Sequence, residues 1–218
     1  MKSITPNDAS KYCVEICGRA PVIPVIIYNE VETAFDLGSA LVNGGLPILE
    51  VTLRTPNALA VISEMQKISG AVVGAGTLMN KKDVINALEA GAQFGVSPGA
   101  TNQVIHACEE YGLPLLAGAA TATEAMNLFD RGYTVQKFFP AEASGGANAL
   151  KALSSPLEQI RFCPTGGVTL ENAKSYLDLP NVLCVGGSWV ASNQAVDDAN
   201  WGQAEEIVQH TYERLSIS

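Results

Sequence analysis

Apolar, β-branched segments recur along the chain, and segments with the spacing of amphipathic helices separate them. The predicted strands are Val22–Tyr28, Pro47–Leu53, Ala71–Thr77, Gln93–Ser97, Pro114–Ala119, Thr134–Pro140, Ile160–Thr165 and Val182–Gly187. Strict alternation of strands and helices is typical of an α/β protein with a parallel sheet. Eight such units predict closure into a (β/α)8 TIM barrel, and an open doubly wound sheet is the alternative.

The segments between the strands predict helices that end at glycine, a common stop signal. Examples are Val31–Asn43, Lys81–Ala90, Thr101–Tyr111 and Thr123–Arg131. The pattern predicts an extra N-terminal helix within residues 1–20, before the first strand, and a last helix that closes the chain at Asn200–Leu215. The 218 residues contain no linker or low-complexity segment. Barrels of this kind typically need about 200 to 250 residues, so residues 1–218 are expected to form a single barrel domain.

Composition narrows the possible functions. Hydrophobic residues make up 47%, enough for a large core, and charged residues only 16%, which suggests that some surface is buried in an oligomer. The net charge of −9 and the absence of a basic run disfavour nucleic-acid binding. No segment approaches the roughly 20 apolar residues of a membrane span. The polar N-terminus carries no signal-peptide core, so a cytoplasmic protein is expected.

Cysteine and histidine usage bears on disulfides and metals. The five cysteines are odd in number and form no C-x-x-C pair, so neither a disulfide framework nor a zinc knuckle is expected. Cys163 and Cys184 fall in strand-like segments and are predicted to be reduced core residues. The two histidines, His106 and His210, fall in helical patterns. A histidine-rich metal site is therefore not predicted.

Charged residues occur near the carboxyl end of the second predicted strand, the end at which barrel enzymes place their chemistry. Alternation along the strand puts Glu50, Thr52 and Arg54 on one face and Val51 and Leu53 on the other. The apolar pair is expected to face the helices, so Glu50 and Arg54 should face the barrel axis. A buried ion pair adds little stability, because the cost of desolvation can exceed the Coulombic gain. A functional role for Glu50 and Arg54 is therefore favoured over a structural one.

The sixth predicted strand carries a lysine near its end. By the same alternation, Lys137 and Phe139 should both point toward the axis. A buried amine is costly unless it is paired or neutral. One interpretation is a salt bridge to a carboxylate such as Glu50. The other is a nucleophilic amine, with its pKa lowered by burial and by a nearby cation such as Arg54.

Glycine-rich turns follow the last two predicted strands. Thr165-Gly166-Gly167 precedes Val168, where a helix is expected to open, and Gly186-Gly187-Ser188 ends the eighth strand. Glycine turns at helix N-termini expose backbone N–H groups that bind phosphate. Their position after strands seven and eight matches the phosphate site of many barrels. The third strand ends at Thr77, whose hydroxyl is expected at the mouth.

Six ordered motifs resemble the family of 2-keto-3-deoxy-6-phosphogluconate (KDPG) and 4-hydroxy-2-oxoglutarate aldolases. They are Leu49-Glu50-Val51-Thr52-Leu53-Arg54-Thr55, Gly74-Ala75-Gly76-Thr77, Val96-Ser97-Pro98-Gly99, Lys137-Phe138-Phe139-Pro140-Ala141-Glu142, Arg161-Phe162-Cys163-Pro164-Thr165-Gly166-Gly167 and Gly186-Gly187-Ser188-Trp189. The resemblance runs from about Pro21 to Trp189, with near-family spacing. The first 20 residues and the tail after Ala191 carry little of it.

The resemblance implies a role for each matching position. Lys137 would form the Schiff base, and Glu50 would be the general acid–base. The implied substrate-binding residues are Arg54 and Thr77 at the pyruvate carboxylate, Pro98 and Phe139 around the imine carbon, and Thr165, Gly166, Gly167, Gly187 and Ser188 at the phosphate end. One departure is Ala117-Gly118-Ala119-Ala120, where family members usually carry proline near position 117 and a Gly–hydrophobic–Ser/Thr turn. This departure bears on substrate preference.

The implied reaction is a class I aldol cleavage of KDPG to pyruvate and glyceraldehyde 3-phosphate, the aldolase step of the Entner–Doudoroff route. It needs no metal or organic cofactor, because the lysine imine accepts the electrons. The resemblance also implies cleavage of 4-hydroxy-2-oxoglutarate to pyruvate and glyoxylate, and a homotrimer. A related 2-keto-3-deoxy sugar acid, such as the 6-phosphogalactonate, is the alternative substrate.

Three other classes remain open from the residues. A phosphate-binding isomerase or epimerase barrel would share the two glycine turns but would not need an inward lysine. A metal-dependent aldolase is disfavoured because no histidine is expected at the mouth. A barrel without activity that serves as a binding module is disfavoured by the joint presence of Glu50, Arg54 and Lys137.

Overall fold

The computed structural model describes residues 3–216 and contains one eight-stranded parallel sheet. The strands are β1 (Val22–Ile26), β2 (Ile48–Thr52), β3 (Val72–Gly76), β4 (Phe94–Val96), β5 (Leu115–Ala119), β6 (Val135–Phe138), β7 (Arg161–Pro164) and β8 (Val185–Gly187). Their order is β7-β6-β5-β4-β3-β2-β1-β8. Single bridges join Phe162 to Val182 and Thr165 to Gly186, so the two ends of the sheet meet. The fold is the predicted (β/α)8 barrel.

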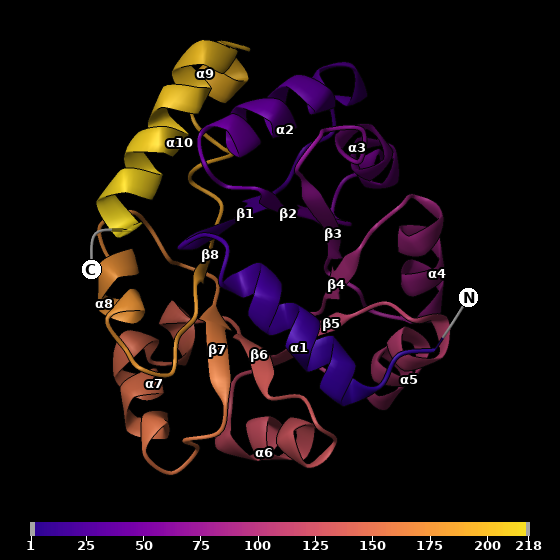
Figure 1. The fold of residues 1–218 in the computed structure, drawn as a ribbon, viewed down its shortest axis with the longest axis vertical. Helices are drawn as coiled ribbons and strands as arrows, with labels where there is room; N and C mark the ends of the chain where they lie inside the picture. Colours follow the sequence, from indigo (N-terminus) through magenta and orange to yellow (C-terminus); the bar gives the residue numbers. More distant parts are fainter. Residues whose placement is uncertain (1–2, 217–218) are drawn as a thin grey trace.

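Helices surround the barrel in the order of the sequence (Figure 1). They are α1 (Pro6–Cys17), α2 (Ala34–Asn43), α3 (Ala58–Met65), α4 (Lys81–Glu89), α5 (Asn102–Tyr111), α6 (Ala122–Asp130), α7 (Gly146–Ser154), α8 (Ala173–Leu177), α9 (Gln194–Asp197) and α10 (Trp201–Ser216). Short 3-10 helices, η1 (Val31–Thr33) and η2 (Glu142–Ser144), precede α2 and α7. The predicted extra N-terminal and closing helices are confirmed as α1 and α10. None of the helices described is long and apolar enough to cross a bilayer.

Sequence signals explain several helix boundaries. The Thr121 hydroxyl accepts from the N–H of Glu124, and the Glu124 carboxylate accepts from the N–H of Thr121, which forms a capping box at the start of α6. At the end of α5, Gly112 adopts φ 77°, a left-handed conformation that glycine takes without a Cβ clash. These local signals begin α6 and end α5 within one residue of the predicted positions.

Alternation along the strands divides the core into two clusters. The larger cluster lies between the strands and the surrounding helices. The smaller lies inside the barrel, where Ile48, Phe94 and Val135 point toward the axis from the beginnings of their strands. Helix α1 crosses this opening in Figure 1, and its buried Cys13, Ile16 and Cys17 belong to the inner cluster. Helix α1 therefore closes the N-terminal end of the barrel and leaves the carboxyl ends of the strands as the mouth.

Candidate active site

Glu50 and Lys137 meet inside the barrel although 87 positions separate them in the chain. Both lie within strands, β2 and β6, and their side chains point to the axis as alternation predicted. Lys137 is 5% exposed and Glu50 is 2% exposed. Lys137 Nζ donates to Glu50 Oε1 at 3.1 Å. The structure thus contains the ion pair considered from the sequence, in a place where a proton can pass between the two groups.

A small cavity of about 130 Å³ surrounds this pair at the mouth of the barrel. Seven of the predicted site residues line it: Glu50, Arg54, Thr77, Pro98, Lys137, Phe139 and Thr165. Its volume is below the roughly 300 to 1,000 Å³ of sites for drug-sized ligands, so it fits the reacting end of a small substrate. Val25 and Thr52 also line it and were not predicted. Alternation had already placed Thr52 on the same face of β2 as Glu50, without assigning it a role in the site.

Aromatic and cationic side chains complete the wall. Lys137 Nζ lies 5.3 Å from the centroid of the Phe139 ring, within reach of a cation–π contact. Arg54 lies one turn beyond the end of β2 and is exposed at the mouth. The alternation used to orient Arg54 therefore ends before this residue, and its place at the cavity comes from the turn. In this position the guanidinium is available to an anionic group of a substrate.

Thr77 adopts a left-handed backbone conformation, with φ 66°. A β-branched residue rarely takes this conformation, which costs on the order of 1–3 kcal/mol and is concentrated at functional sites. The turn aims the Thr77 side chain into the cavity instead of along the strand. Space for Glu50 comes from the same strand, because a Cβ on Gly76 would lie 2.4 Å from Glu50 Oε1.

Neighbouring residues donate hydrogen bonds to the carbonyl groups of the glycine turn after β7. Gly166 and Gly167 have φ of 99° and 77°. The N–H of Glu142 donates to the Gly166 carbonyl at 3.0 Å, and Asn172 Nδ2 donates to the Gly167 carbonyl at 3.1 Å. Both turn carbonyls are thus engaged by protein donors.

The helices that follow the glycine turns begin later than predicted. Helix α8 begins at Ala173 and not at Val168, and the helix after β8, α9, begins only at Gln194. The expectation that these turns sit at helix N-termini is therefore wrong. Loops with their own turns occupy the intervening residues, including Ser188, which is exposed. Any anion held here would depend on the local N–H groups and the Ser188 hydroxyl, without a helix dipole directly behind them.

Thr165 connects the two parts of the site. It lines the cavity of Lys137, is 6% exposed, and is bridged to Gly186. A Cβ on Gly186 would lie 2.2 Å from Thr165 Oγ1, so the glycine provides the space that the threonine fills. Gly166 lies beside Phe139, since its Cβ would come 3.2 Å from the ring. Thr165 and Gly166 therefore border on the cavity of Lys137, whereas Gly167 lies against Glu142 and Gly187 against Trp189.

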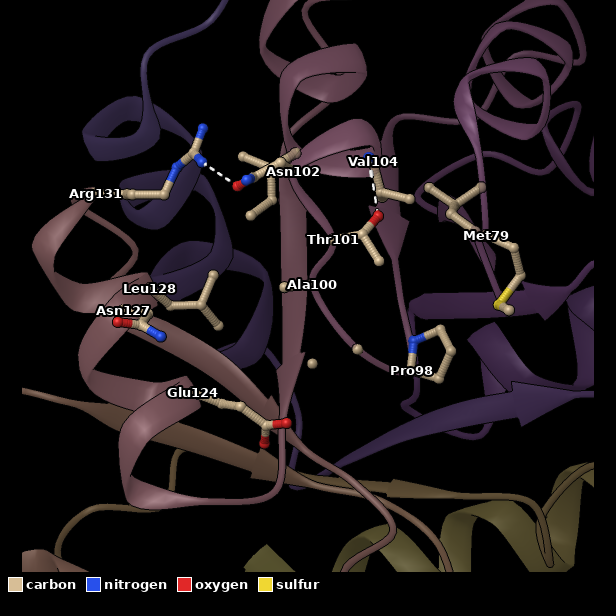
Figure 2. A pocket seen from close by; sticks show the side chains of 14 residues that line it. Met79, Pro98, Ala100, Thr101, Asn102, Val104, Glu124, Asn127, Leu128 and Arg131 are labelled. Carbon is tan, nitrogen blue, oxygen red and sulfur yellow. Dashed lines mark hydrogen bonds between the residues drawn. The ribbon is translucent and has the colours of Figure 1, made fainter.

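A larger cavity, of about 620 Å³, lies outside the barrel (Figure 2). It is bounded by Met79 after β3, by residues 98–102 at and before the start of α5, and by Glu124 on α6 and Arg131 just after it. Arg131 is engaged by Asn102 at 2.9 Å and by Glu109 at 3.5 Å. Of the predicted site residues, only Pro98 lines this cavity. The larger of these two cavities is therefore not the one that contains most of the predicted site residues.

The five cysteines are buried and reduced, which confirms the prediction for Cys163 and Cys184. Burial raises the pKa of Cys13 to about 12, and it raises the pKa of Cys108 to about 12 as well. Thiols held in the neutral form are poor nucleophiles and poor metal ligands. Within residues 3–216, no group of three or more His, Cys, Asp or Glu side chains is arranged to hold a metal ion.

Comparison with known proteins gives consistent results. A family model described as "Aldolase: KDPG and KHG aldolase" matches residues 13–207. The KHG/KDPG aldolase of Escherichia coli K12 is 43% identical over 203 residues, which cover 93% of this chain and 95% of that protein. These matches and the barrel fold define an aldolase, which is a lyase.

Two solved structures are similar over nearly the whole chain. The KDPG aldolase of Zymomonas mobilis ZM4 with 3-phosphoglycerate is 42% identical, with a TM-score of 0.87, covering 93% of this chain and 96% of that one. The KDPG aldolase of Legionella pneumophila, with pyruvate captured at low pH as a covalent carbinolamine intermediate, is 40% identical with a TM-score of 0.87. It covers 91% of this chain and 97% of that chain. The protein belongs to the KDPG and KHG aldolase family.

Proposed function

We propose that this protein is a class I aldolase that cleaves KDPG to pyruvate and glyceraldehyde 3-phosphate through a Schiff base on Lys137. The observation that carries the proposal is the buried Lys137–Glu50 pair in the small cavity at the barrel mouth. The carbinolamine captured in the Legionella pneumophila relative and the 3-phosphoglycerate bound to the Zymomonas mobilis relative support it. No metal or organic cofactor is required by this chemistry.

The pair supplies both the nucleophile and the proton acceptor. Neutral Lys137 adds to the C2 ketone, and loss of water gives an iminium ion. Glu50, directly or through a water, then accepts the proton of the C4 hydroxyl. The C3–C4 bond breaks, its electrons form an enamine, and glyceraldehyde 3-phosphate leaves. Protonation of the enamine and hydrolysis of the imine release pyruvate and regenerate the amine.

The remaining residues of the site hold the substrate in this proposal. Arg54 and Thr77 bind the carboxylate of the pyruvate unit, and Pro98 and Phe139 confine the imine carbon. The phosphate binds at the other end, to Gly166, Gly167, Gly187 and Ser188, with Thr165 between the two ends. The positions of Arg54 at the mouth and of the two glycine turns beside Phe139 and Thr165 support this orientation.

Imine trapping is the direct test. Borohydride with pyruvate should inactivate the protein and add one pyruvyl group at Lys137, measured by mass spectrometry of peptides. Lys137→Arg, which keeps the charge beside Glu50, should abolish labelling and lower turnover by roughly 10⁴- to 10⁶-fold. A label at another lysine, or undiminished cleavage by the variant, would exclude the mechanism. Pyruvate release that persists in the presence of a chelator would exclude a metal-dependent aldolase.

The proposal extends to 4-hydroxy-2-oxoglutarate, which presents the same C2 ketone and C4 hydroxyl but no phosphate. It should therefore use Lys137 and Glu50 and bypass the glycine turns. A 2-keto-3-deoxy-6-phosphogalactonate, differing in configuration, is the alternative phosphorylated substrate. Initial rates on the three compounds with one preparation would rank them.

We further propose a cytoplasmic homotrimer with one barrel domain per subunit. Two groups of exposed apolar side chains support association. One group, near the 620 Å³ cavity, consists of Met79, Met126 and Phe129. The other, after β1, consists of Ile27 and Phe35. Two different patches fit a heterologous contact that closes into a ring. Five free cysteines fit a reducing compartment. Light scattering should give three times the 22.9 kDa chain mass, and Phe35→Asp should reduce it.

A further inference from the structure

Glu142 ends the Lys137–Glu142 motif and takes no part in the proposed chemistry, yet it touches the glycine turn at the proposed phosphate end. A Cβ on Gly167 would lie 2.7 Å from both Cβ and Cγ of Glu142. The first carbons of this side chain are therefore packed against the turn. The carboxylate is one bond further, and rotation about the Cβ–Cγ bond can bring it toward the turn or carry it away while this contact is kept.

A negative charge in this place is unfavourable for a phosphorylated substrate. The segments Thr165–Val168 and Gly186–Trp189 contain no lysine or arginine. Within residues 3–216, none of the ion pairs involves Glu142. Among residues 3–216, no cationic side chain therefore forms an ion pair with this carboxylate. Its orientation decides how strongly it repels an anion at the turn.

The orientation is fixed by Tyr176. The Tyr176 hydroxyl donates a hydrogen bond to Glu142 Oε1. Tyr176 is buried in α8, so its ring cannot follow the carboxylate if Glu142 rotates. Burial, and then the hydrogen bond to Glu142, raise the pKa of Tyr176 above its ordinary value, so the hydroxyl stays a donor at every working pH.

Gly146 makes room for this contact. A Cβ there would lie 3.4 Å from both Glu142 Oε1 and Tyr176 Oη. The bonded pair therefore lies against the start of α7, while the Glu142 stem lies against Gly167. The carboxylate and the turn are on different sides of the same side chain.

We propose that Tyr176 is a positioning residue that holds the Glu142 carboxylate away from the Gly166–Gly167 turn and thereby sets the affinity for phosphorylated substrates. The inference rests on the proposed phosphate site. Tyr176 has no contact with the substrate in this role. It acts by preventing a mobile carboxylate from reaching the phosphate.

The experiment uses three variants of the full chain and two substrates. Tyr176→Phe removes only the hydroxyl, Glu142→Gln removes only the charge, and the double variant combines them. Tyr176→Phe should raise KM for KDPG by about 5- to 30-fold, as expected for two anions a few ångströms apart in a partly hydrated site. KM for 4-hydroxy-2-oxoglutarate should change less than about 2-fold. Glu142→Gln in the Tyr176→Phe background should restore KM for KDPG.

Inhibition by inorganic phosphate and the salt dependence of KM are two measurements that would not change if Tyr176 had a purely structural role. The inhibition constant of inorganic phosphate should rise in Tyr176→Phe and return in the double variant. Because repulsion is screened, the KM ratio of Tyr176→Phe to the parent should fall as NaCl increases from about 0.05 M to about 1 M. An unchanged KM for KDPG, equal losses on both substrates, or a loss that persists in the double variant would each overturn the inference.

Ser188→Ala, assayed in parallel, separates this inference from the function on which it rests. A selective loss of KDPG affinity in Ser188→Ala together with an unchanged Tyr176→Phe would overturn the role of Tyr176 alone. If Ser188→Ala and Gly167→Ala both affect the two substrates equally, the proposed phosphate site is wrong, and the inference falls with it.

Discussion

The two ends of the proposed site use different chemical groups. At the lysine end these groups are side chains that project from strands, and at the phosphate end they are backbone N–H groups of glycines. Glu50 and Lys137 are buried, charged and fixed by each other at 3.1 Å. Gly166 and Gly167 have positive φ and present no side chain at all. The first arrangement suits a reaction, which needs a particular pKa and a particular atom. The second suits recognition of an anion by geometry.

This difference makes the two ends separable by mutation. Changes at the lysine end should reduce turnover of every substrate, because each one passes through the same imine. Changes at the phosphate end should reduce affinity only for substrates that carry a phosphate. The four substitutions below test this separation, from the largest expected effect to the smallest.

Glu50→Gln should lower kcat on both substrates by about 10²- to 10⁴-fold, the usual contribution of a positioned acid–base group. The amide cannot accept the C4 hydroxyl proton, but Lys137 remains in place. Borohydride trapping with pyruvate should therefore still label the variant. Rapid-quench rates for cleavage and mass spectrometry for the label measure the two steps, and near-normal cleavage would remove Glu50 from the mechanism.

Gly76→Ala should act at the lysine end without removing any reacting group. The added methyl would approach Glu50 Oε1 to 2.4 Å, so the carboxylate must move. A displacement on the order of 1 Å can cost about 10²-fold in rate. We expect a loss of that size in kcat for both substrates, with KM little changed. Ser63→Ala, which loses only helix-surface hydrogen bonds far from the cavity, is the matched control.

Gly167→Ala should act mainly at the phosphate end. It places a Cβ 2.7 Å from the Glu142 stem and forces a residue with φ 77° to carry a side chain. We expect KM for KDPG to rise by roughly 10- to 100-fold as the turn shifts, and KM for 4-hydroxy-2-oxoglutarate to rise far less. Circular dichroism and thermal unfolding would show whether the variant is folded, since a general defect depresses both substrates.

Ser188→Ala should produce the smallest change. Loss of a hydrogen bond to a charged group costs about 1.5–3 kcal/mol, which corresponds to about 10- to 150-fold when the bond is fully formed. Ser188 is exposed, so we expect the lower end of that range, again confined to KDPG. An equal effect on the unphosphorylated substrate would mean that the two ends are not separate.

The barrel itself was predictable because its pattern is periodic. All eight predicted strands are confirmed, with ends that differ by at most three residues, as are α1 and α10. Period-2 alternation also predicted that Glu50 and Lys137 point inward, and closure of the sheet then brings them together. What alternation could not predict was any geometry beyond a strand end. Arg54 and Thr77 lie in turns, and the left-handed conformation of Thr77 follows from tertiary packing.

The phosphate end was predicted less well for the same reason. Glycine pairs at positions 166 and 186 indicated where turns occur, but not that several residues separate them from α8 and α9. The contact between Glu142 in η2 and Tyr176 in α8 joins residues 34 positions apart, from helices that follow different strands. No pattern within a short stretch of sequence predicts a contact between two such residues. The signal that singled out Glu142 was its place at the end of a family motif, which carries no information about its partner.

Closure of the barrel by α1 also has a consequence for the kinetics of chemical modification. Cys13 and Cys17 on that helix, with Cys163 and Cys184 beneath it, are sealed from solvent, and Cys163 Sγ lies 3.6 Å from Cys184 Sγ. A thiol reagent can reach them only while the helix is detached. The labelling rate of the native protein therefore reports the population of this partly open form, as amide exchange does for a backbone segment.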